Sequence, residues 1–571
     1  MEKKVSIIKL FQEKKYSEVI FLIENKVPEN QKNSSVLNLL GVSRILKGKL
    51  KKEDFLLAID NFKTATLKEH QTKNSLEAFK NFINISVELY DYDKSTENHQ
   101  EVIKFFKEIL NIYDQNKDFF SKDEFFLLSL IRVYTRLNDL VKVRESYEEL
   151  IKNKFYRPET ICSLIYNNLF VNNWKQEDFL KYGRLLDKNI KIYENEKLSL
   201  IHKDKNKKIK IGFLSSDIKS KHSVIYFLKT VIDNYNKDKF EIYLFSNNFK
   251  SSSDDETIRS IKSSINKNYD IYGMNDIEII NLIRGNKIDI LIDLMGLTSD
   301  QKIKILKNRA APIQIVWCGF CNTTGIEEVD YIISDPNLIY NSELDLYREK
   351  IIFMPKIWNC HTGLEIERNF NDSPFLNNNM VTFGSFNNFG KINSSVVETW
   401  SKIIKKVKNS KLILKSSRPR VTEILSEKFQ NQGVLNSVEF MTTLTNFEDH
   451  MQLYKKIDIA LDTFPYNGVT TSFEAIWMGV PVITMKGYNF NSRCGESINK
   501  NLNMEYLIAE DEIDYVAKAK ELSDNKEKLL DIRKKIFNQA TSSPLFDTKS
   551  FSNDFFKSLA TVYNKYLQDL K

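Results

Sequence analysis

The sequence has few cysteines and no long hydrophobic runs. Its 571 residues include only 5 Cys. Five cysteines in a chain of this length do not form a disulfide framework, which excludes the class of small disulfide-stapled domains. No apolar run approaches the ~20 residues that a membrane-spanning helix needs, so we expect no membrane span. Charged residues interrupt the apolar residues of the N-terminus, which argues against a signal peptide and predicts a cytoplasmic protein.

Metal and redox chemistry have little support in the sequence. Cys318 and Cys321 form a C-x-x-C pair, but no second pair with metal spacing accompanies them. No strand-then-helix pattern of the thioredoxin type begins at Cys318. We therefore expect neither a resident metal nor a redox centre.

The charges are mixed in sign along the whole chain. There are 84 basic and 76 acidic residues, a net charge of +8. Nucleic-acid binding would require basic residues clustered with aromatic residues on one face, and the sequence shows no such cluster. A small positive excess is compatible with an anionic small-molecule substrate.

The first 200 residues have the pattern of consecutive helices. Glycine and proline are rare there, and apolar residues recur at three- and four-residue spacing, as at Ile59, Phe62 and Ala65. Segments around Tyr16 and Ala58 suggest degenerate helix pairs of about 34 residues, the size of tetratricopeptide (TPR) repeats. Such pairs must stack to bury their apolar faces, and a stack presents a long concave surface.

The pattern changes after the polar run at residues 202–208. Buried strands predicted at 209–214, 240–245 and 288–293 alternate with helices, and a second set follows at 381–386, 412–414, 437–440, 457–461 and 480–484. This alternation predicts two parallel, Rossmann-like α/β halves with a groove between them. We predict a helical domain at 1–203, a first lobe at 204–375, a second lobe at 376–549, and a helix at 550–571 that packs back on the core.

The most informative segment is residues 458–481, DIALDTFPYNGVTTSFEAIWMGVP. A buried strand ends at Asp462, a turn with Asn467 and Gly468 follows, and Thr470 and Thr471 open a helix. The free N–H groups of a helix start, with the helix dipole behind them, form an anion site.

Glu474 lies one turn further along this helix, on the same face as Thr470 or Thr471. A carboxylate at that place can accept hydrogen bonds from two ribose hydroxyls. The spacing is equally compatible with a simpler role, in which a threonine caps the helix and Glu474 completes a capping box.

Several blocks, in this order along the chain, resemble the O-GlcNAc transferase family, glycosyltransferase family 41. They are SSD at 215–217 followed by His222, DLMGLT at 293–298, RAAPIQIVWCGFCNTTG at 309–325, FGSFNNFGK at 383–391 and the segment at 458–481. The resemblance covers most of residues 209–545 and is far more specific than any single motif. Helical repeats before the core are also typical of that family.

The resemblance implies a GT-B fold, inversion at the anomeric carbon and no metal requirement. Lys391 is then expected to pair with the donor diphosphate in place of a divalent cation, with Asn388 beside it as a hydrogen-bond donor. Considered alone, Lys391 has the pattern of a surface lysine at a helix start.

The resemblance also assigns roles to two histidines. His222 is expected to face the sugar and the acceptor hydroxyl, where an imidazole suits proton transfer, with Asp217 orienting it or a backbone loop. His450 is expected to contact the nucleotide. Asn467, Gly468, Thr470, Thr471 and Glu474 complete the expected donor site.

Two positions depart from the family pattern. Many relatives have His or Gly where Val469 stands, and His or Tyr where Leu297 stands. The fold prediction is unaffected, but the donor sugar and the acceptor stay open.

Three functions are therefore compared. The first is transfer of N-acetylglucosamine from UDP-N-acetylglucosamine to Ser or Thr hydroxyls of a protein held by the helical arm. The second keeps the chemistry with UDP-glucose or GDP-fucose as donor, or with a glycan as acceptor. The third is an inactive scaffold that binds partners. A homodimer is compatible with all three.

Overall fold

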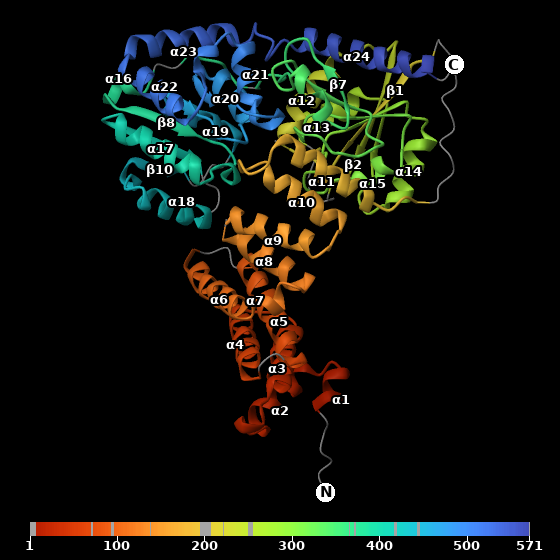
Figure 1. Ribbon diagram of the computed structural model, residues 1–571, viewed down its shortest axis with the longest axis vertical. Coiled ribbons are helices and arrows are strands. Elements are labelled where there is room, and N and C mark those ends of the chain that lie inside the picture. Colours follow the sequence, from red (N-terminus) through yellow and green to blue (C-terminus); the bar gives the residue numbers. More distant parts are fainter. Residues whose placement is uncertain are drawn as a thin grey trace. The chain divides into compact units, whose positions relative to one another are not determined.

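The computed structural model describes residues 7–69, 72–92, 96–137, 139–193, 207–220, 222–248, 255–364, 366–370, 373–415, 419–441 and 446–569. The chain divides into two compact units, Met1–Phe155 and Tyr156–Lys571 (Figure 1). The domain boundary predicted between residues 203 and 204 falls in the stretch 194–206, outside the described residues.

The described part of the first unit is helical throughout, which confirms the all-helical prediction for this part of the chain. Its helices are α1 (Ile7–Gln12), α2 (Tyr16–Lys26), α3 (Ser34–Leu46), α4 (Lys52–Lys68), α5 (Lys73–Tyr92), α6 (Thr96–Gln115), α7 (Lys117–Phe120), α8 (Glu124–Arg136) and α9 (Leu140–Lys152).

Helix α8 illustrates why these segments fold as they do. The Asp123 side chain accepts a hydrogen bond from the backbone N–H of Phe125 at 2.8 Å and so caps the helix start. Phe126, Leu130 and Val133 recur on one face and are buried. The Phe126 ring lies 5.5 Å from that of Phe79 on α5, so the apolar face of α8 is covered by a neighbouring helix.

The second unit contains two parallel sheets. Within the described residues the first has seven strands in the order β3-β2-β1-β4-β5-β6-β7. Their bounds are β1 (Ile209–Ser215), β2 (Phe240–Ser246), β3 (Lys267–Asp270), β4 (Ile290–Asp293), β5 (Ile313–Val316), β6 (Tyr331–Ser334) and β7 (Lys350–Phe353). Helices α12 (Ser223–Asn234), α13 (Glu256–Ser264), α14 (Asp276–Gly285) and α15 (Ile303–Lys307) connect the first five strands.

The second sheet has six described strands in the order β10-β9-β8-β11-β12-β13. They are β8 (Val381–Ser385), β9 (Ser410–Lys415), β10 (Val438–Met441), β11 (Ile459–Leu461), β12 (Val482–Met485) and β13 (Ile508–Ala509). The helices of this lobe are α16 (Phe375–Asn378), α17 (Ser394–Lys406), α18 (Pro419–Asn431), α19 (Phe447–Leu453), α20 (Thr470–Trp477), α21 (Cys494–Asn501), α22 (Glu512–Asp524) and α23 (Lys526–Ala540). The prediction of two Rossmann-like halves is confirmed.

The strand orders identify where each sheet can hold a ligand. In an open parallel sheet, ligands bind beyond the carboxyl ends of the strands where the strand order reverses. That point lies between β1 and β4 in the first sheet and between β8 and β11 in the second. The loop after β1 carries Asp217 and His222, whereas the loops after β8 and β11 carry Lys391 and the Thr470–Thr471 turn.

Two helices that the sequence analysis places in the helical arm belong to the second unit. These are α10 (Pro158–Asn168) and α11 (Gln176–Asn189). The Gln176 amide donates to the Asn322 side chain of the first lobe at 2.8 Å. Gly183 lies directly against Gly325, since a Cβ built on Gly183 would be 2.8 Å from the Gly325 Cα. The two helices pack against the lobe because their small and polar residues fit its loops.

The last helix, α24 (Thr548–Asp569), follows the second lobe in sequence but packs on the first (Figure 1). The Ser552 hydroxyl donates to the carbonyl of Thr230 on α12 at 2.9 Å. The Phe555 ring lies 4.7 Å from that of Trp317, which follows β5. Phe555 and Trp317 belong to one apolar core that continues through both lobes.

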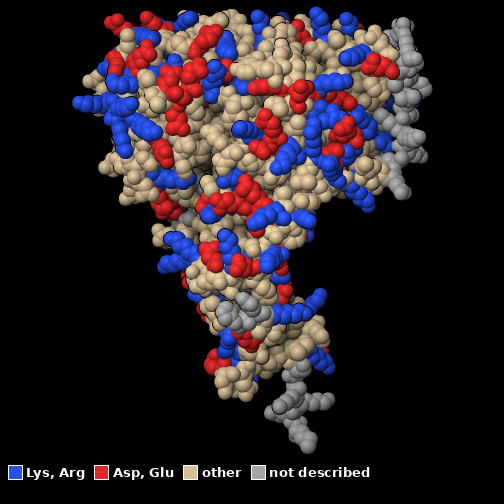
Figure 2. All heavy atoms as spheres, viewed as in Figure 1, with Lys and Arg blue, Asp and Glu red and all other residues tan. Residues whose placement is uncertain are grey.

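The surface charges are mixed on the face shown in Figure 2, where basic and acidic side chains alternate over both lobes. This mixture agrees with the interleaved charges of the sequence. No helix among the described residues combines the length and the apolar character needed to cross a membrane.

The close approach of α11 to the first lobe generates a stability prediction. Gly183→Ala places a methyl group 2.8 Å from the Thr324 carbonyl oxygen and the Gly325 Cα. Relieving such an overlap costs about 1–3 kcal/mol, so we expect the apparent melting temperature to fall by a few degrees. Gly285→Ala on α14 is the matched control because its new methyl group meets nothing within 4 Å. Equal melting temperatures for the two variants would contradict this packing.

Candidate active site

The turn between β11 and α20 is organised by the buried carboxylate of Asp462. Its Oδ1 accepts from the N–H groups of Gly468 at 2.6 Å and Thr463 at 2.9 Å, and its Oδ2 accepts from the Thr484 hydroxyl at 2.8 Å. Burial raises the pKa of Asp462 to about 6, and these hydrogen bonds oppose that rise. The carboxylate therefore fixes the path of the turn.

Gly468 allows the loops after β8 and β11 to meet. A Cβ at this position would be 2.6 Å from Asn387 Oδ1 and 2.6 Å from Thr471 Oγ1. The absence of a side chain leaves room for the Thr471 hydroxyl to donate to Asn387 Oδ1 at 2.9 Å. Asn387 is thus a site residue that the sequence analysis missed.

Lys391 lies at this turn. Its Nζ donates to the carbonyl of Asn467 at 2.6 Å and lies 4.1 Å from the centre of the Tyr466 ring. Burial lowers the pKa of Lys391, while the nearby Asp462 carboxylate opposes this shift. The expected pairing of Lys391 with the Thr470–Thr471 region therefore has a geometric basis, because Asn467 is part of the same turn.

Asn388 holds the backbone before Lys391. Its Oδ1 accepts from the Gly390 N–H at 2.9 Å, which caps the short 3-10 helix Phe389–Lys391. The Asn388 side chain is otherwise exposed. Asn388 lies close to Lys391 in the chain, which fits the expected contact with the sugar donor. Its Oδ1 already accepts from Gly390, so that contact would use the amide N–H groups as hydrogen-bond donors.

The start of α20 has the features of an anion site. Val469 is the residue before the helix and provides no side-chain cap. Within the described residues, the backbone N–H groups of Thr470 and Thr471 have no hydrogen-bond acceptor. Unpaired N–H groups at a helix N-terminus attract phosphate oxygens.

Glu474 does not form the capping box that the spacing also allowed. Its Oε2 accepts from the Tyr454 hydroxyl at 2.8 Å and lies 3.0 Å from His450 Nε2. The Lys415 ammonium lies 3.3 Å from the other ring nitrogen of His450. Burial lowers the pKa of Lys415 and raises that of Tyr454. The structure thus joins Glu474 and His450, which are 24 residues apart.

His222 and Asp217 form a second group, after β1. The Nδ1 of His222 accepts from the Val224 N–H at 3.4 Å, so we assign the ring proton to Nε2, which lies 3.4 Å from Asp217 Oδ1. Burial lowers the pKa of His222, which keeps the ring neutral. Both ring nitrogens are engaged in this arrangement, which differs from the proton-transfer role expected for His222 with Asp217 orienting it. Asp217 Oδ1 also lies 3.4 Å from the Lys219 ammonium, and the carboxylate retains free lone pairs.

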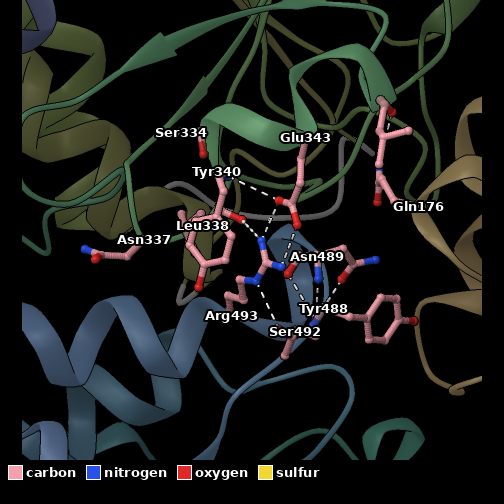
Figure 3. Close-up of polar contacts among 12 residues, drawn as sticks. Gln176, Ser334, Asn337, Leu338, Tyr340, Glu343, Tyr488, Asn489, Ser492 and Arg493 are labelled. Atoms are coloured by element: carbon pink, nitrogen blue, oxygen red, sulfur yellow. Dashed lines mark hydrogen bonds and ion pairs between the residues drawn. The ribbon is translucent and has the colours of Figure 1, made fainter.

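The two lobes are joined by an ion pair centred on Arg493 (Figure 3). Its guanidinium, on the second lobe, contacts both carboxylate oxygens of Glu343 in the first lobe at 2.6 and 2.7 Å. It also donates to the carbonyl of Leu338 at 3.1 Å and stacks 3.9 Å from the centre of the Tyr340 ring. The contacts of Arg493 are those of a link between the lobes.

A cavity of about 700 Å³ lies beside the segment that follows β11, and Lys391 does not line it. Phe464 and Pro465 line it together with Trp174, Gln176 and Tyr488. None of the residues expected to hold a donor contributes to its wall. Elsewhere among the described residues, no group of three or more His, Cys, Asp or Glu side chains is placed to bind a metal ion.

Two parallel Rossmann-like lobes, each with candidate site residues at its reversal point, define the GT-B class of fold. The sequence model of "Glycosyl transferase family 41" matches residues 148–365 and 368–555. The chain belongs to this family. The match begins before α10, in agreement with the inclusion of α10 and α11 in the second unit.

The relatives include plant proteins. The chain is 32% identical over 364 residues to the "Probable UDP-N-acetylglucosamine--peptide N-acetylglucosaminyltransferase SPINDLY" of Hordeum vulgare, covering 62% of this chain and 38% of that protein. It is 27% identical over 368 residues to the protein SEC of Arabidopsis thaliana, covering 63% and 37%. The chain thus aligns with about two fifths of the length of these relatives.

A solved structure supports the fold. An O-GlcNAc transferase mutant from Thermobaculum terrenum superposes with a TM-score of 0.75 at 20% identity, covering 94% of this chain and 99% of that one. At this identity the similarity establishes the architecture.

The Arg493–Glu343 pair generates the second prediction. In Glu343→Ala the almost fully buried guanidinium loses its counter-charge, and breaking such a pair costs roughly 3 kcal/mol. We expect a clear fall in the denaturant midpoint of unfolding of the second unit. Glu510→Ala, which removes an exposed partner of Lys486, is the control and should change the midpoint little. Similar midpoints for both variants would show that the pair does not hold the lobes.

Proposed function

We propose that this chain is an inverting glycosyltransferase that moves N-acetylglucosamine from UDP-N-acetylglucosamine to Ser or Thr hydroxyls of a protein. The printed names of its plant relatives support this donor and a peptide acceptor. The observation that carries the proposal is the position of the Lys391 ammonium, 2.6 Å from the carbonyl of Asn467. Asn467 stands three residues before the first residue of α20, Thr470.

This position suits stabilisation of a leaving diphosphate. As the bond between the sugar and the diphosphate breaks, negative charge grows on the departing oxygen. The Lys391 ammonium and the N–H groups of Thr470 and Thr471 are fixed before the reaction, so they stabilise this charge without reorganising. No metal is needed for this step, because the positive charge comes from the protein itself.

The remaining residues have complementary roles in the proposal. Glu474 has its Oε1 available for ribose hydroxyls, while Tyr454 and His450 hold its Oε2. Asp217, oriented by His222, accepts the proton of the attacking hydroxyl. The helical unit binds the acceptor polypeptide, in line with the concave surfaces of stacked helix pairs.

Removal of the Lys391 charge gives the third prediction. We expect Lys391→Ala to lower turnover of the nucleotide sugar by roughly a hundredfold or more, because the leaving group loses its main countercharge. Turnover is measured as UDP or GDP release over a panel of UDP-N-acetylglucosamine, UDP-glucose and GDP-fucose. Circular dichroism and the melting temperature should be retained.

Lys402→Ala is the matched control, since Lys402 is an exposed lysine on the nearby helix α17. Near-normal turnover of Lys391→Ala would refute the assigned role. If the unmodified chain prefers GDP-fucose, the proposed donor is wrong and GDP-fucose takes its place. If no nucleotide shifts the melting temperature, the chain is better described as an inactive scaffold.

The lowered pKa of Lys391 gives the fourth prediction. A lysine with a lowered pKa loses its positive charge at a lower pH than an ordinary lysine, so activity should fall as the pH rises through that pKa. The alkaline limb of kcat/KM, which reports the free enzyme, should have its midpoint below 10.5.

In the donor complex, the diphosphate charge favours the ammonium, so the alkaline limb of kcat should lie at higher pH than that of kcat/KM. Coincident alkaline limbs for the two parameters would contradict a contact between Lys391 and the diphosphate.

A further inference from the structure

A row of three aromatic rings leads from helix α10 to Lys391, and these rings have no role in the mechanism proposed above. The Tyr166 ring lies 5.3 Å from that of Phe170, and the Phe170 ring lies 5.1 Å from that of Tyr466. The Tyr466 ring is in turn the one beside the Lys391 ammonium. Three aromatic rings thus connect a helix outside both sheets to the lysine of the second lobe.

The backbone of this row is fixed on the second lobe. The Asn393 amide donates to the carbonyls of Phe170 at 3.1 Å and Phe464 at 2.8 Å. The Asn491 amide also donates to the carbonyl of Leu169 at 3.4 Å. These hydrogen bonds hold the end of α10 against the turn that contains Tyr466.

The Tyr166 and Tyr466 hydroxyls are available for a ligand. Both side chains are half-buried, and neither hydroxyl has a hydrogen-bond partner among the described residues. Neither is a fully enclosed polar atom. Burial raises the pKa of both phenols, so both remain protonated and can donate a hydrogen bond at neutral pH.

The charge of Asp217, in the other half of the site, acts on Tyr166. The Asp217 carboxylate contributes to the raised pKa of Tyr166, and Tyr166 contributes to that of Tyr466. Along the row, the rings lie in the order Tyr166, Phe170 and Tyr466, and the Lys391 ammonium follows Tyr466. In an inverting displacement, the sugar lies between the group that accepts the proton and the group that stabilises the leaving oxygen.

We propose that Tyr166 and Tyr466 form the wall that contacts the sugar of the donor, with the Tyr166 hydroxyl donating a hydrogen bond to a sugar hydroxyl. Aromatic rings with a polar tip suit a sugar, which has apolar C–H faces and a polar edge. This inference rests on the proposed sugar-transfer function and assigns a substrate contact to a helix that precedes both lobes.

The test compares nucleotide and nucleotide-sugar binding in Tyr166→Phe, which keeps the ring and removes only the hydroxyl. Affinities for UDP and for UDP-N-acetylglucosamine are measured by calorimetry without acceptor, and donor hydrolysis is followed in parallel. We expect the affinity for UDP-N-acetylglucosamine to fall about tenfold, the loss of one hydrogen bond, while the affinity for UDP stays within about twofold.

Tyr182→Phe is the matched control, because Tyr182 is a half-buried tyrosine on α11 whose ring stacks on Trp174 at 4.5 Å. A set of deoxy-sugar donors identifies the contacted hydroxyl. The donor that lacks it should bind unmodified chain and Tyr166→Phe equally well, since the partner is then absent from both.

Unchanged donor affinity and hydrolysis in Tyr166→Phe would overturn this inference and leave the proposed function standing. Equal losses for UDP and for UDP-N-acetylglucosamine would overturn it as well, because the hydroxyl would then act on the nucleotide part. If the unmodified chain binds neither UDP nor any donor of the panel, the proposed function itself fails.

Discussion

The site depends on one buried carboxylate. Asp462 accepts the N–H groups of the turn that follows β11, and this turn presents the Asn467 carbonyl to Lys391 and the unpaired N–H groups of α20. A carboxylate without a compensating charge would be costly at this depth. Lys391 places a positive charge near this carboxylate, and its Nζ donates to the Asn467 carbonyl of the same turn, so the turn that Asp462 fixes also positions the positive group of the proposed reaction.

Much of the fold follows from local pattern in the sequence. Short segments rich in apolar residues at 209–214 and 381–386 correspond to β1 and β8, and the helical periodicity before residue 155 corresponds to the first unit. Short strands such as β3 and β13 were missed, because four residues or fewer carry too little periodicity to distinguish a strand from a loop. The strand order, and hence the reversal points, cannot be derived from any single segment.

The site was predicted unevenly. Lys391, considered alone, has the pattern of a surface lysine, and only the joint order of several blocks pointed to its role. Asn387 and Asp462 act through contacts with residues distant in the chain, which spacing does not reveal. Tyr166 was missed because its helix has the periodicity of a packed arm helix. The run of Asn and aromatic residues at 166–174 was the available signal.

The contact between Gly183 and Gly325 also limits how this architecture can be recombined. Backbone touches backbone there, so neither position can acquire a side chain unless the other surface moves with it. Helix α11 and the loop before β6 therefore have to be kept together when the chain is recombined. A chimera that exchanges the helical arm between family members has its natural junction near residue 156, ahead of α10, and a cut close to residue 200 would separate two surfaces that fit only each other.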